Sequence, residues 1–329
     1  MRLLVLGGTA WLGSHIVRDA LERGHDVTAL ARGESGEVPK GAEFVRADRS
    51  HPGALDGLTG SWDAAIDVTR HPGQVRTAVA ALGERVAHWV LVSSCSVYAD
   101  PTRFGTDESA PVHPPLDGDV MRDMEEYGPA KSACELALLS GVGAERAHVA
   151  RVSLIGGPGD WSGRGVYWPW RFAHPSNPER RVLVSDADTP VQLIDVRDLA
   201  AWTVDAAERR IAAVANVGGE TLTLAEHLDV ARAGADVEPI AVDPEWLQAR
   251  GVQPWMGPRS LPLWLPQDAA GLNSHSMALA ESLGLRRRPL AETLADTLAW
   301  REAHADVEVR AGLSDDDELE LLAELLQAD

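Results

Sequence analysis

The N-terminal part of the chain alternates short apolar runs with amphipathic segments. Residues 2–6 are almost wholly apolar and predict a buried strand. Residues 14–23 carry apolar side chains at helical spacing and predict a helix, which Gly24 is placed to end. The same patterns predict strands at 27–30, 43–45, 64–68 and 88–92 and a helix at 75–82. Because strands alternate with helices, we expect parallel pairing and a doubly wound α/β sheet.

Beyond residue 100 the pattern is less regular. Residues 101–119 are rich in proline and poor in apolar side chains, so we expect a loop that is either a lid or a passive connection. Residues 156–178 collect glycines, prolines and tryptophans and indicate irregular structure. The remaining predicted elements are helices at 127–139, 196–209, 223–234, 290–304 and 319–326 and strands at 147–154 and 191–194.

The composition excludes some classes of function. The chain has 329 residues, 45% of them hydrophobic, and 30 Lys and Arg against 50 Asp and Glu give a net charge of −20. Since nucleic acids and anionic membranes bind basic surfaces, we expect neither as a partner. The two cysteines indicate a reducing compartment, and no apolar run is long enough to span a membrane. Glycines and a charged helix follow the first apolar run, which argues against a signal peptide, so we expect a cytoplasmic protein.

Residues 7–13 (GGTAWLG) form a glycine-rich turn between the first strand and the first helix. This arrangement exposes backbone N–H groups to a pyrophosphate, so we predict a dinucleotide site. Gly7 permits the turn and Gly13 permits close helix packing, whereas Ala10 stands where a glycine is usual and should shift the pyrophosphate slightly. The residues assigned to the cofactor here are Gly7, Thr9, Ala10, Trp11, Leu12 and Gly13.

This site defines the expected architecture. We predict a Rossmann fold at 1–155 and a smaller C-terminal α/β substrate-binding domain at 156–329. No clean linker separates them, so we expect the segment around 190–217 to return to the Rossmann domain.

The ends of the next strands predict the remaining cofactor contacts. Where an acidic residue would bind the adenosine ribose, the chain has Arg32 and no carboxylate, which favours NADP over NAD unless Arg32 is simply a surface residue. Asp48 fits a place beside the adenine, and Arg49 either contacts the cofactor or lies in a solvated turn. The fourth strand ends at the edge where such sheets bind ligands, which adds Val68, Thr69 and Arg70.

Candidate catalytic residues follow in the next part of the chain. Tyr127 and Lys131 lie four residues apart at a helix start and therefore share one face. A nearby ammonium favours the phenolate, which makes the tyrosine a better acid/base at neutral pH. The fifth strand ends in hydroxyls that can hold a substrate oxygen, namely Ser93, Ser94 and Ser96.

Taken in order, these motifs resemble the extended short-chain dehydrogenase/reductase superfamily and, within it, the NAD(P)-dependent epimerase/dehydratase-type family. The resemblance rests on the glycine-rich turn, Asp48, residues 93–98 (SSCSVY) and residues 127–131 (YGPAK). It continues through residues 151–160 and 190–200 and so covers nearly the whole chain.

The resemblance implies a role for each candidate. Tyr127 is the acid/base, Lys131 binds the nicotinamide ribose and lowers the pKa of Tyr127, and Ser94 is the supporting hydroxyl. Ser93 is assigned to the cofactor site, and Ser93 and Ser96 are alternatives for the supporting hydroxyl. The segment implied to line the nicotinamide comprises Val152, Ser153, Leu154 and Ile155.

We therefore expect an oxidoreductase that uses NADP(H), or else NAD(H), on a carbonyl or secondary alcohol of a small molecule. One alternative is a nucleotide-sugar epimerase or dehydratase with transient hydride transfer. Residues 151–157 lack the asparagine that many sugar-nucleotide enzymes of this family carry, which weakens it. Another alternative is a non-catalytic dinucleotide sensor or RNA-binding relative. RNA-binding relatives in this superfamily also carry alanine at the position of Ala10. The resemblance further implies a structural lock at 195–198 and a homodimer through two helices.

The substrate site is less clearly indicated. The expected substrate domain contains tryptophans that form either a stacking pocket or core packing, namely Trp161, Trp168, Trp170, Trp255 and Trp264. Arg164 and Arg171 either bind an anionic substrate or pair with acidic residues, and His71 either approaches the nicotinamide or stays at the surface. The histidines show no metal-ligand spacing, and residues 315–317 predict a solvated capping run before the last helix rather than a calcium site.

Overall fold

The computed structural model describes residues 1–328, and the chain divides into two units. The first unit comprises 1–153, 196–218 and 275–286, and the second comprises 154–195, 219–274 and 287–329. The predicted α/β class with a doubly wound parallel sheet is confirmed. Two segments return to the first unit, at 196–218 and at 275–286. The sequence predicted a return around 190–217 and did not predict the one at 275–286.

A seven-stranded parallel sheet, in the order β10-β6-β5-β4-β1-β2-β3, forms the centre of the first unit. The order reverses between β1 and β4, and ligands bind at such a reversal in doubly wound sheets. The strands are β1 (Arg2–Leu6), β2 (Asp26–Ala31), β3 (Glu43–Arg46), β4 (Trp62–Asp67), β5 (Val86–Ser94), β6 (Ala147–Val152) and β10 (Ala213–Val217). Central strands such as β1 are apolar because helices cover both faces of the sheet.

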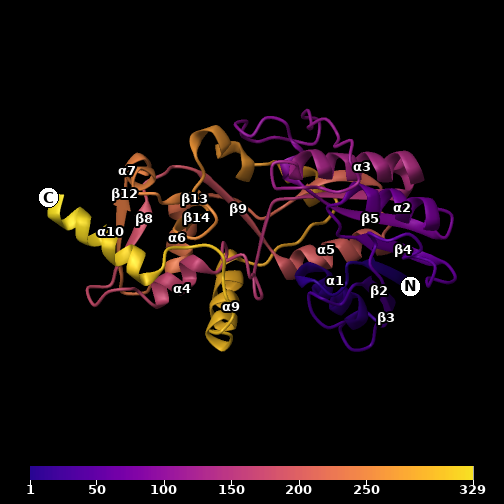
Figure 1. Ribbon diagram of the computed structural model, residues 1–329, viewed down its shortest axis with the longest axis horizontal. Helices are drawn as coiled ribbons and strands as arrows, with labels where there is room; N and C mark the ends of the chain where they lie inside the picture. Colours follow the sequence, from indigo (N-terminus) through magenta and orange to yellow (C-terminus); the bar gives the residue numbers. More distant parts are fainter. Residues whose placement is uncertain (329) are drawn as a thin grey trace. The chain divides into compact units, whose positions relative to one another are not determined.

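Helices lie on both faces of this sheet (Figure 1). α2 (Pro72–Leu82) packs beside α3 (Tyr127–Val142) on one face, and α1 (Trp11–Glu22) packs beside α5 (Val196–Glu208) on the other. The unit also contains α8 (Ala278–Ser282) and the short 3₁₀ helices η1 (Cys95–Val97) and η2 (Ala144–Arg146).

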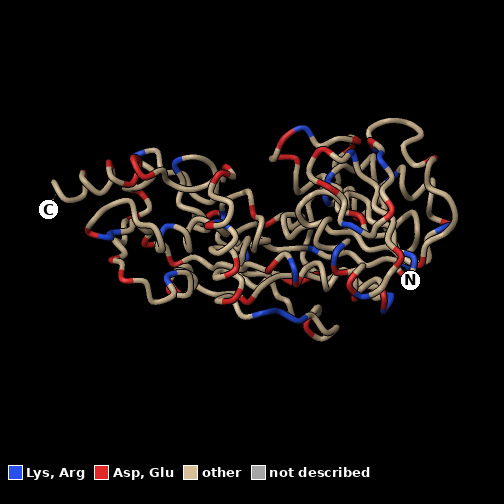
Figure 2. Tube along the Cα trace, turned by 90° about the horizontal axis from the view of Figure 1, so that it is seen from below, with Lys and Arg blue, Asp and Glu red and all other residues tan. Residues whose placement is uncertain are grey.

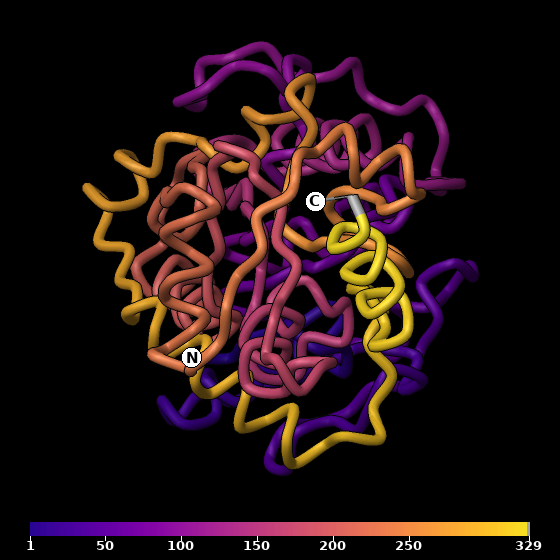
Figure 3. The backbone as a smooth tube through the Cα atoms, turned by 90° about the vertical axis from the view of Figure 1, so that its left-hand side faces the viewer, coloured from indigo at the N-terminus to yellow at the C-terminus, as the bar shows by residue number. Residues whose placement is uncertain are grey.

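Shorter sheets and helices form the second unit (Figures 1 and 3). Its strands are β7 (Leu154–Gly156), β8 (Arg181–Ser185), β9 (Pro190–Asp195), β11 (Thr221–Thr223), β12 (Glu238–Val242), β13 (Gln253–Trp255) and β14 (Ser260–Pro262). Its helices are α4 (Tyr167–Ala173), α6 (Leu224–Arg232), α7 (Pro244–Ala249), η3 (Gln267–Asn273), α9 (Leu290–Ala303) and α10 (Asp315–Ala328). The C-terminal helix α10, yellow in Figure 3, packs on β8 and buries Leu321 and Leu322.

Some predicted boundaries were wrong for identifiable reasons. The strand predicted at 147–154 is interrupted at Ser153, where the chain leaves the first unit. The irregular stretch predicted at 156–178 contains α4, whose Pro169 lies in the first turn, where a missing N–H is tolerated. Residues 315–317 belong to the first turn of α10 rather than preceding it, and acidic side chains are favourable there. The loop predicted at 101–119 contains no helix or named strand.

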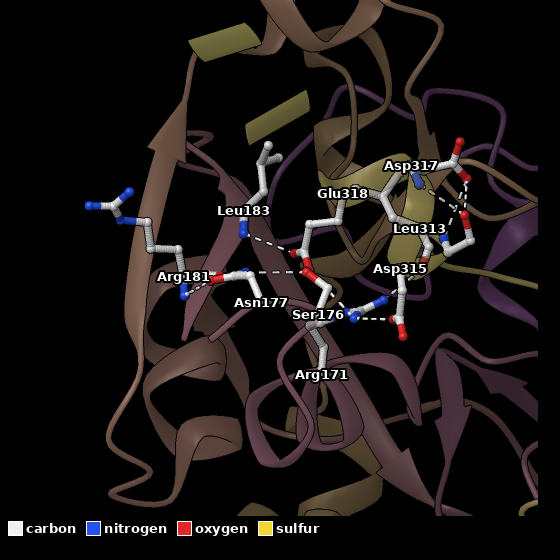
Figure 4. A network of polar contacts seen from close by, with 10 residues as sticks. Arg171, Ser176, Asn177, Arg181, Leu183, Leu313, Asp315, Asp317 and Glu318 are labelled. Carbon is white, nitrogen blue, oxygen red and sulfur yellow. Dashed lines mark hydrogen bonds and ion pairs between the residues drawn. The ribbon is translucent and has the colours of Figure 1, made fainter. Parts of the chain in front are cut away.

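A buried ionic cluster ties α4 to α10 within the second unit (Figure 4). The carboxylate of Glu318 is fully buried and accepts hydrogen bonds from the backbone N–H of Leu183 and the hydroxyl of Ser176. Arg171 contacts Glu318 at 3.4 Å and donates to Asp315 at 2.6 Å. Because a lone buried charge is costly, this pairing explains how α10 can place a glutamate inside an apolar cluster.

Both signs of charge are distributed along the chain within each unit (Figure 2). In the described residues 1–328, no helix combines the length and apolar character needed to cross a membrane.

Buried histidines predict acid sensitivity. Burial lowers the pKa of His227 in α6 from 6.5 to about 4, and that of His148 in β6 likewise. As the pH falls, these two histidines are therefore protonated in the unfolded chain before they are protonated in the folded chain. The stabilisation from the neutral ring is complete above pH 6.5 and is lost as the pH falls toward about 4.

The free energy of unfolding should fall as the pH is lowered from 7.5 to about 5. We predict that His227→Leu makes this fall less steep, by up to about 1.4 kcal/mol per pH unit. Urea denaturation at each pH measures this slope. His304→Leu, which alters an exposed ring, is the control and should retain the wild-type slope. An unchanged slope in the His227 variant would contradict the assignment.

Candidate functional site

The glycine-rich turn connects β1 to α1 at the carboxyl edge of the sheet. Gly7 has φ +102°, which favours glycine, and a Cβ on Gly13 would lie 2.0 Å from the Gly7 carbonyl oxygen. Both glycines are therefore required for the helix to start this close to the strand. Ala10 is the N-cap residue of α1, where no side chain caps the helix and no acidic residue occupies the first turn. This helix start suits a phosphate group.

A cavity of about 760 Å³ opens beside this turn. Its volume lies within the range of roughly 300–1,000 Å³ that is typical of ligand sites. The structure brings together around it nine of the residues predicted to bind the cofactor, namely Gly7, Thr9, Ala10, Arg32, Asp48, Arg49, Val68, Thr69 and Arg70. Trp11, Leu12 and Gly13 follow in the first turn of α1 and are not among the lining residues.

The part of the cavity after β2 carries both signs of charge. Arg32 lies 3.2 Å from Glu34, and the Arg32 side chain is 57% exposed, so this pair is weak and easily rearranged. The prediction that no carboxylate lies here is wrong, because Glu34 lines the same cavity. Asp48 accepts hydrogen bonds from the backbone and hydroxyl of Ser50, and these bonds lower the pKa of its carboxyl group. Asp48 is therefore an anionic acceptor at the cavity wall.

Arg49 lines the cavity but is engaged elsewhere. Its guanidinium donates to both oxygens of Asp67, at 2.8 and 2.7 Å, and to the carbonyl of Gln74 at 2.8 Å. Both charged side chains are buried. Asp67 also accepts from the backbone N–H of Thr69. Arg49 therefore holds the loop after β4 in place, in addition to any contact with a ligand.

The loop after β4 is held by its own side chains. The Thr69 hydroxyl donates to the Gln74 side chain at 2.6 Å and accepts from the backbone N–H of His71 at 3.1 Å. Burial first, and then the charge of Arg70, lowers the pKa of His71. His71 also lines the cavity, and its Nδ1 lies 3.3 Å from the backbone N–H of Met121. A neutral ring can accept this bond.

Lys131 connects the cofactor cavity to the helix that carries Tyr127. Its ammonium is buried at 3% exposure and donates to the carbonyl oxygens of Thr69 and Val92, both at 2.6 Å. These carbonyls lie just beyond the end of β4 and near the end of β5. An ammonium has three N–H donors, so one remains for a ligand or for Tyr127.

Tyr127 is the first residue of α3, and Ser94 is the last residue of β5. The Ser94 side chain accepts from the backbone N–H of Ser96 and donates to its hydroxyl, each at 3.1 Å. A Cβ on Gly128 would lie 2.3 Å from the Ser96 carbonyl oxygen, so the start of α3 packs directly against this turn. The turn that carries Ser94 and Ser96 therefore lies beside the start of α3, although Ser94 and Tyr127 are 33 positions apart in the sequence.

Ser93 has a different environment from Ser94. Its buried hydroxyl donates to Glu135 at 2.5 Å, and Glu135 in turn pairs with Arg151 at 2.9 Å. This pair joins α3 to β6 and is itself buried. The Ser93 hydroxyl is therefore occupied in holding α3 against the sheet, which leaves Ser94 better placed as the supporting hydroxyl.

Of the other predicted residues, Val152 pairs in register with Ser94 at the carboxyl end of the sheet. Val152 ends β6 and Ser153 follows it, whereas Leu154 and Ile155 belong to β7 in the second unit. Asp195 is buried, with Arg288 of the same unit 3.5 Å away. Trp168 and Trp264 are core residues, and Trp170 packs against His174.

The exposed Trp161 and the partly buried Trp255 of the second unit contact arginines instead. Arg310 lies 4.7 Å from the ring centroid of Trp161, and Arg164 lies 5.1 Å from that of Trp255. Arg171 is paired with carboxylates in the ionic cluster and lies 5.6 Å from the ring centroid of Tyr167, so this arginine is engaged within the fold of the second unit.

Sequence reasoning missed several residues of the site. Glu34, Gln74 and Arg76 line the cavity, and Asp67 and Gly128 position it. Glu34 was the easiest to find, because it follows Arg32 by two positions. In the part of the chain that is described, no cluster of His, Cys, Asp or Glu could hold a metal ion.

Comparisons with known proteins agree with this geometry. The model of the NAD dependent epimerase/dehydratase family matches residues 3–218. No curated protein matches the sequence.

Solved structures of similar fold cover nearly the whole chain. The structure of gox2253 is 22% identical with a TM-score of 0.68, covering 93% of this chain and 99% of that chain. WbmG of Bordetella bronchiseptica, in complex with NAD and UDP, is 19% identical with a TM-score of 0.65, covering 95% and 99%. UDP-N-acetylglucosamine 4-epimerase from Bacillus cereus is 18% identical with a TM-score of 0.63, covering 92% and 99%. At these identities the similarity shows the fold.

The contact at Gly128 yields a stability prediction. Gly128→Ala should lower the free energy of unfolding by about 1–3 kcal/mol, because the added methyl meets the backbone of Ser96. Urea denaturation measures the change. Gly57→Ala is the control, since its Cβ would meet only Val45 at 3.7 Å. Wild-type stability of the Gly128 variant would show that α3 does not depend on this close approach.

Proposed function

Because the chain belongs to the NAD dependent epimerase/dehydratase family, we propose that it is an NAD(P)-dependent oxidoreductase acting on a carbonyl or secondary alcohol. The observation that carries this proposal is the position of Lys131. Its ammonium binds the carbonyl of Thr69, a residue of the cofactor cavity, and extends from the same helix face as Tyr127. A proton-transfer group and a dinucleotide cavity are thereby linked through one side chain.

The residues present fit a dinucleotide. The glycine turn lets α1 start directly beside the end of β1, because Cβ atoms on Gly7 and Gly13 would meet Val68 and the Gly7 carbonyl, and α1 starts without a side-chain cap. Asp48 offers a carboxylate to the adenine amino group, and Lys131 offers its third N–H to a ribose hydroxyl. When bound, the nicotinamide would supply or accept the hydride.

Tyr127 moves the proton in the proposed reaction. In reduction its phenol donates to the substrate oxygen, and in oxidation its phenolate accepts the alcohol proton. The Ser94 hydroxyl donates to the same oxygen and orients it. Lys131, one helical turn further along α3, has one N–H left to donate to the cofactor ribose or to Tyr127.

We propose NADP(H) as the preferred cofactor, with NAD(H) as the second candidate. The support is Arg32, whose guanidinium can exchange its weak contact with Glu34 for a 2′-phosphate. Glu34 acts in the opposite direction, because a carboxylate repels that phosphate and can bind a ribose hydroxyl. The balance of these two side chains decides the preference.

A second candidate function is a nucleotide-sugar epimerase or dehydratase, in which the hydride returns to the substrate. It is favoured by the family and by WbmG, whose structure holds NAD and UDP. The paired aromatic and cationic side chains at Trp161 and Trp255 would suit an anionic substrate that carries a ring. Net consumption of added cofactor supports the oxidoreductase, whereas conversion of substrate without it supports the epimerase or dehydratase.

The proposal also covers the setting of the enzyme. Cys95 and Cys134 are free thiols, in keeping with a cytoplasmic protein. We expect a small-molecule substrate and a homodimer, with no nucleic-acid partner. A non-catalytic role for this chain would leave the combination of Ser94, Tyr127 and Lys131 without a purpose.

Tyr127→Phe tests the mechanism. We predict that turnover of a carbonyl-substrate panel falls by about 10²–10⁴-fold, since the acid/base is lost. Cofactor affinity, measured by quenching of protein fluorescence, should stay close to wild type and serves as the folding control. Wild-type turnover in the variant would contradict the role of Tyr127.

Arg32→Ala tests the cofactor preference. We predict that NADPH affinity falls by about 10- to 100-fold, because a charge-assisted contact to the 2′-phosphate is lost. NADH affinity should be nearly unchanged. Glu34→Gln is the matched variant and should strengthen NADPH binding. Equal losses for both cofactors in the Arg32 variant would overturn the preference.

A further inference from the structure

Residues 116–121, which we call the strap, run beside the cofactor cavity in the first unit. They precede α3 and overlap the end of residues 101–119, for which the sequence left a lid or a passive loop as alternatives. Asp119 and Val120 line the cavity together with Gly73 and Arg76 of α2. The strap is therefore a wall of the cavity and not a distant loop.

The strap is joined to the first turn of α2 at Asp119. The backbone N–H of Gly73 donates to the Asp119 carbonyl at 2.9 Å. Arg76 donates to the Asp119 carboxylate at 2.5 and 3.0 Å and to the Gly118 carbonyl at 2.8 Å. A Cβ on Gly73 would lie 2.7 Å from the Asp119 Cβ, so this close approach depends on glycine.

Two further hydrogen bonds lie on either side of Asp119. The backbone N–H of Met121 donates to His71 Nδ1 at 3.3 Å, and that of Leu116 donates to the Pro129 carbonyl at 2.9 Å. These bonds anchor the two ends of the strap, at the loop after β4 and at the start of α3.

The central ion pair is suited to opening. The side chains of Arg76 and Asp119 are 42% and 73% exposed, so solvent and salt weaken their attraction. Val120 is 59% exposed although it is apolar and lines the cavity. A ligand in the cavity would cover such a side chain, which favours closure over an occupied site.

We propose that residues 116–121 hold the bound dinucleotide in its cavity and that the Arg76–Asp119 pair sets the rate of cofactor release. This inference rests on the proposed function, because it requires a dinucleotide in that cavity. Breaking the ion pair leaves the strap held to α2 through the carbonyls of Gly118 and Asp119 alone, which loosens the cavity wall formed by Asp119 and Val120.

The test compares Asp119→Asn with Asp117→Asn. Both variants remove one negative charge from the same loop, but only Asp119 pairs with Arg76. Stopped-flow displacement of fluorescent NADPH or NADH gives the release rate. We expect Asp119→Asn to release cofactor about two- to fivefold faster than wild type at low salt, and Asp117→Asn to match wild type. At high salt the difference between Asp119→Asn and wild type should shrink, because the ion pair is screened.

Gly73→Ala is a second, independent variant. Its methyl displaces the Asp119 side chain without changing any charge, so it should also speed release. Release from Asp119→Asn at or below the wild-type rate, or equal acceleration by Asp117→Asn, would overturn the role of the ion pair. Failure of the wild-type protein to bind either cofactor would instead overturn the proposed function, and the strap with it.

Discussion

The geometry of the site depends on one buried charge. The ammonium of Lys131 is buried, and it donates hydrogen bonds to the carbonyl oxygens of Thr69 and Val92. A buried ammonium without such partners would be costly. The start of α3, which carries Lys131, must therefore stay close to both carbonyls, one just after β4 and the other near the end of β5. Tyr127 lies one turn before Lys131 on that helix. The same interaction therefore places the candidate acid/base next to the wall of the cofactor cavity.

Other buried charges in the first unit act in the same way. Arg49 with Asp67 secures the loop after β4, and Arg151 with Glu135 secures α3 against β6. Buried ion pairs contribute little net stability compared with apolar packing, but removing one partner is expensive. Here these ion pairs fix positions, because each pair forms in one arrangement of the two segments that carry its side chains. The ionic cluster around Glu318 does the same for α10 in the second unit (Figure 4).

This arrangement separates arginines that hold the fold from arginines that remain available to a ligand. Arg49 is held by Asp67 and Gln74 through both of its terminal nitrogens, whereas Arg32 pairs weakly with the exposed Glu34. Arg76 is intermediate, because its partner Asp119 is itself part of the cavity wall. In this acidic chain, Arg32 and Arg76 therefore line the cavity, and each is paired with an exposed carboxylate that weakens its attraction for an anionic ligand.

The sequence by itself determined the features that depend on local order. Apolar runs and glycine placement located β1, the turn at residues 7–13 and α1, because strand burial and tight turns are encoded within a few residues. Motif spacing located Tyr127 and Lys131, because positions four apart share a helix face. The fold class followed from the alternation of these elements.

Only the tertiary structure decided which polar groups are engaged. Arg171 and Asp315 are 144 positions apart, and Arg76 and Asp119 are 43 apart, so no local pattern links them. The same holds for Trp168, which lies in the core, and Trp161, which is exposed beneath Arg310, although both belong to one tryptophan-rich stretch. Partner choice depends on which segments the folded chain brings within hydrogen-bonding distance. The sequence therefore determined where the chemistry lies along the chain, and the packing of distant segments decided which side chains are left to perform it.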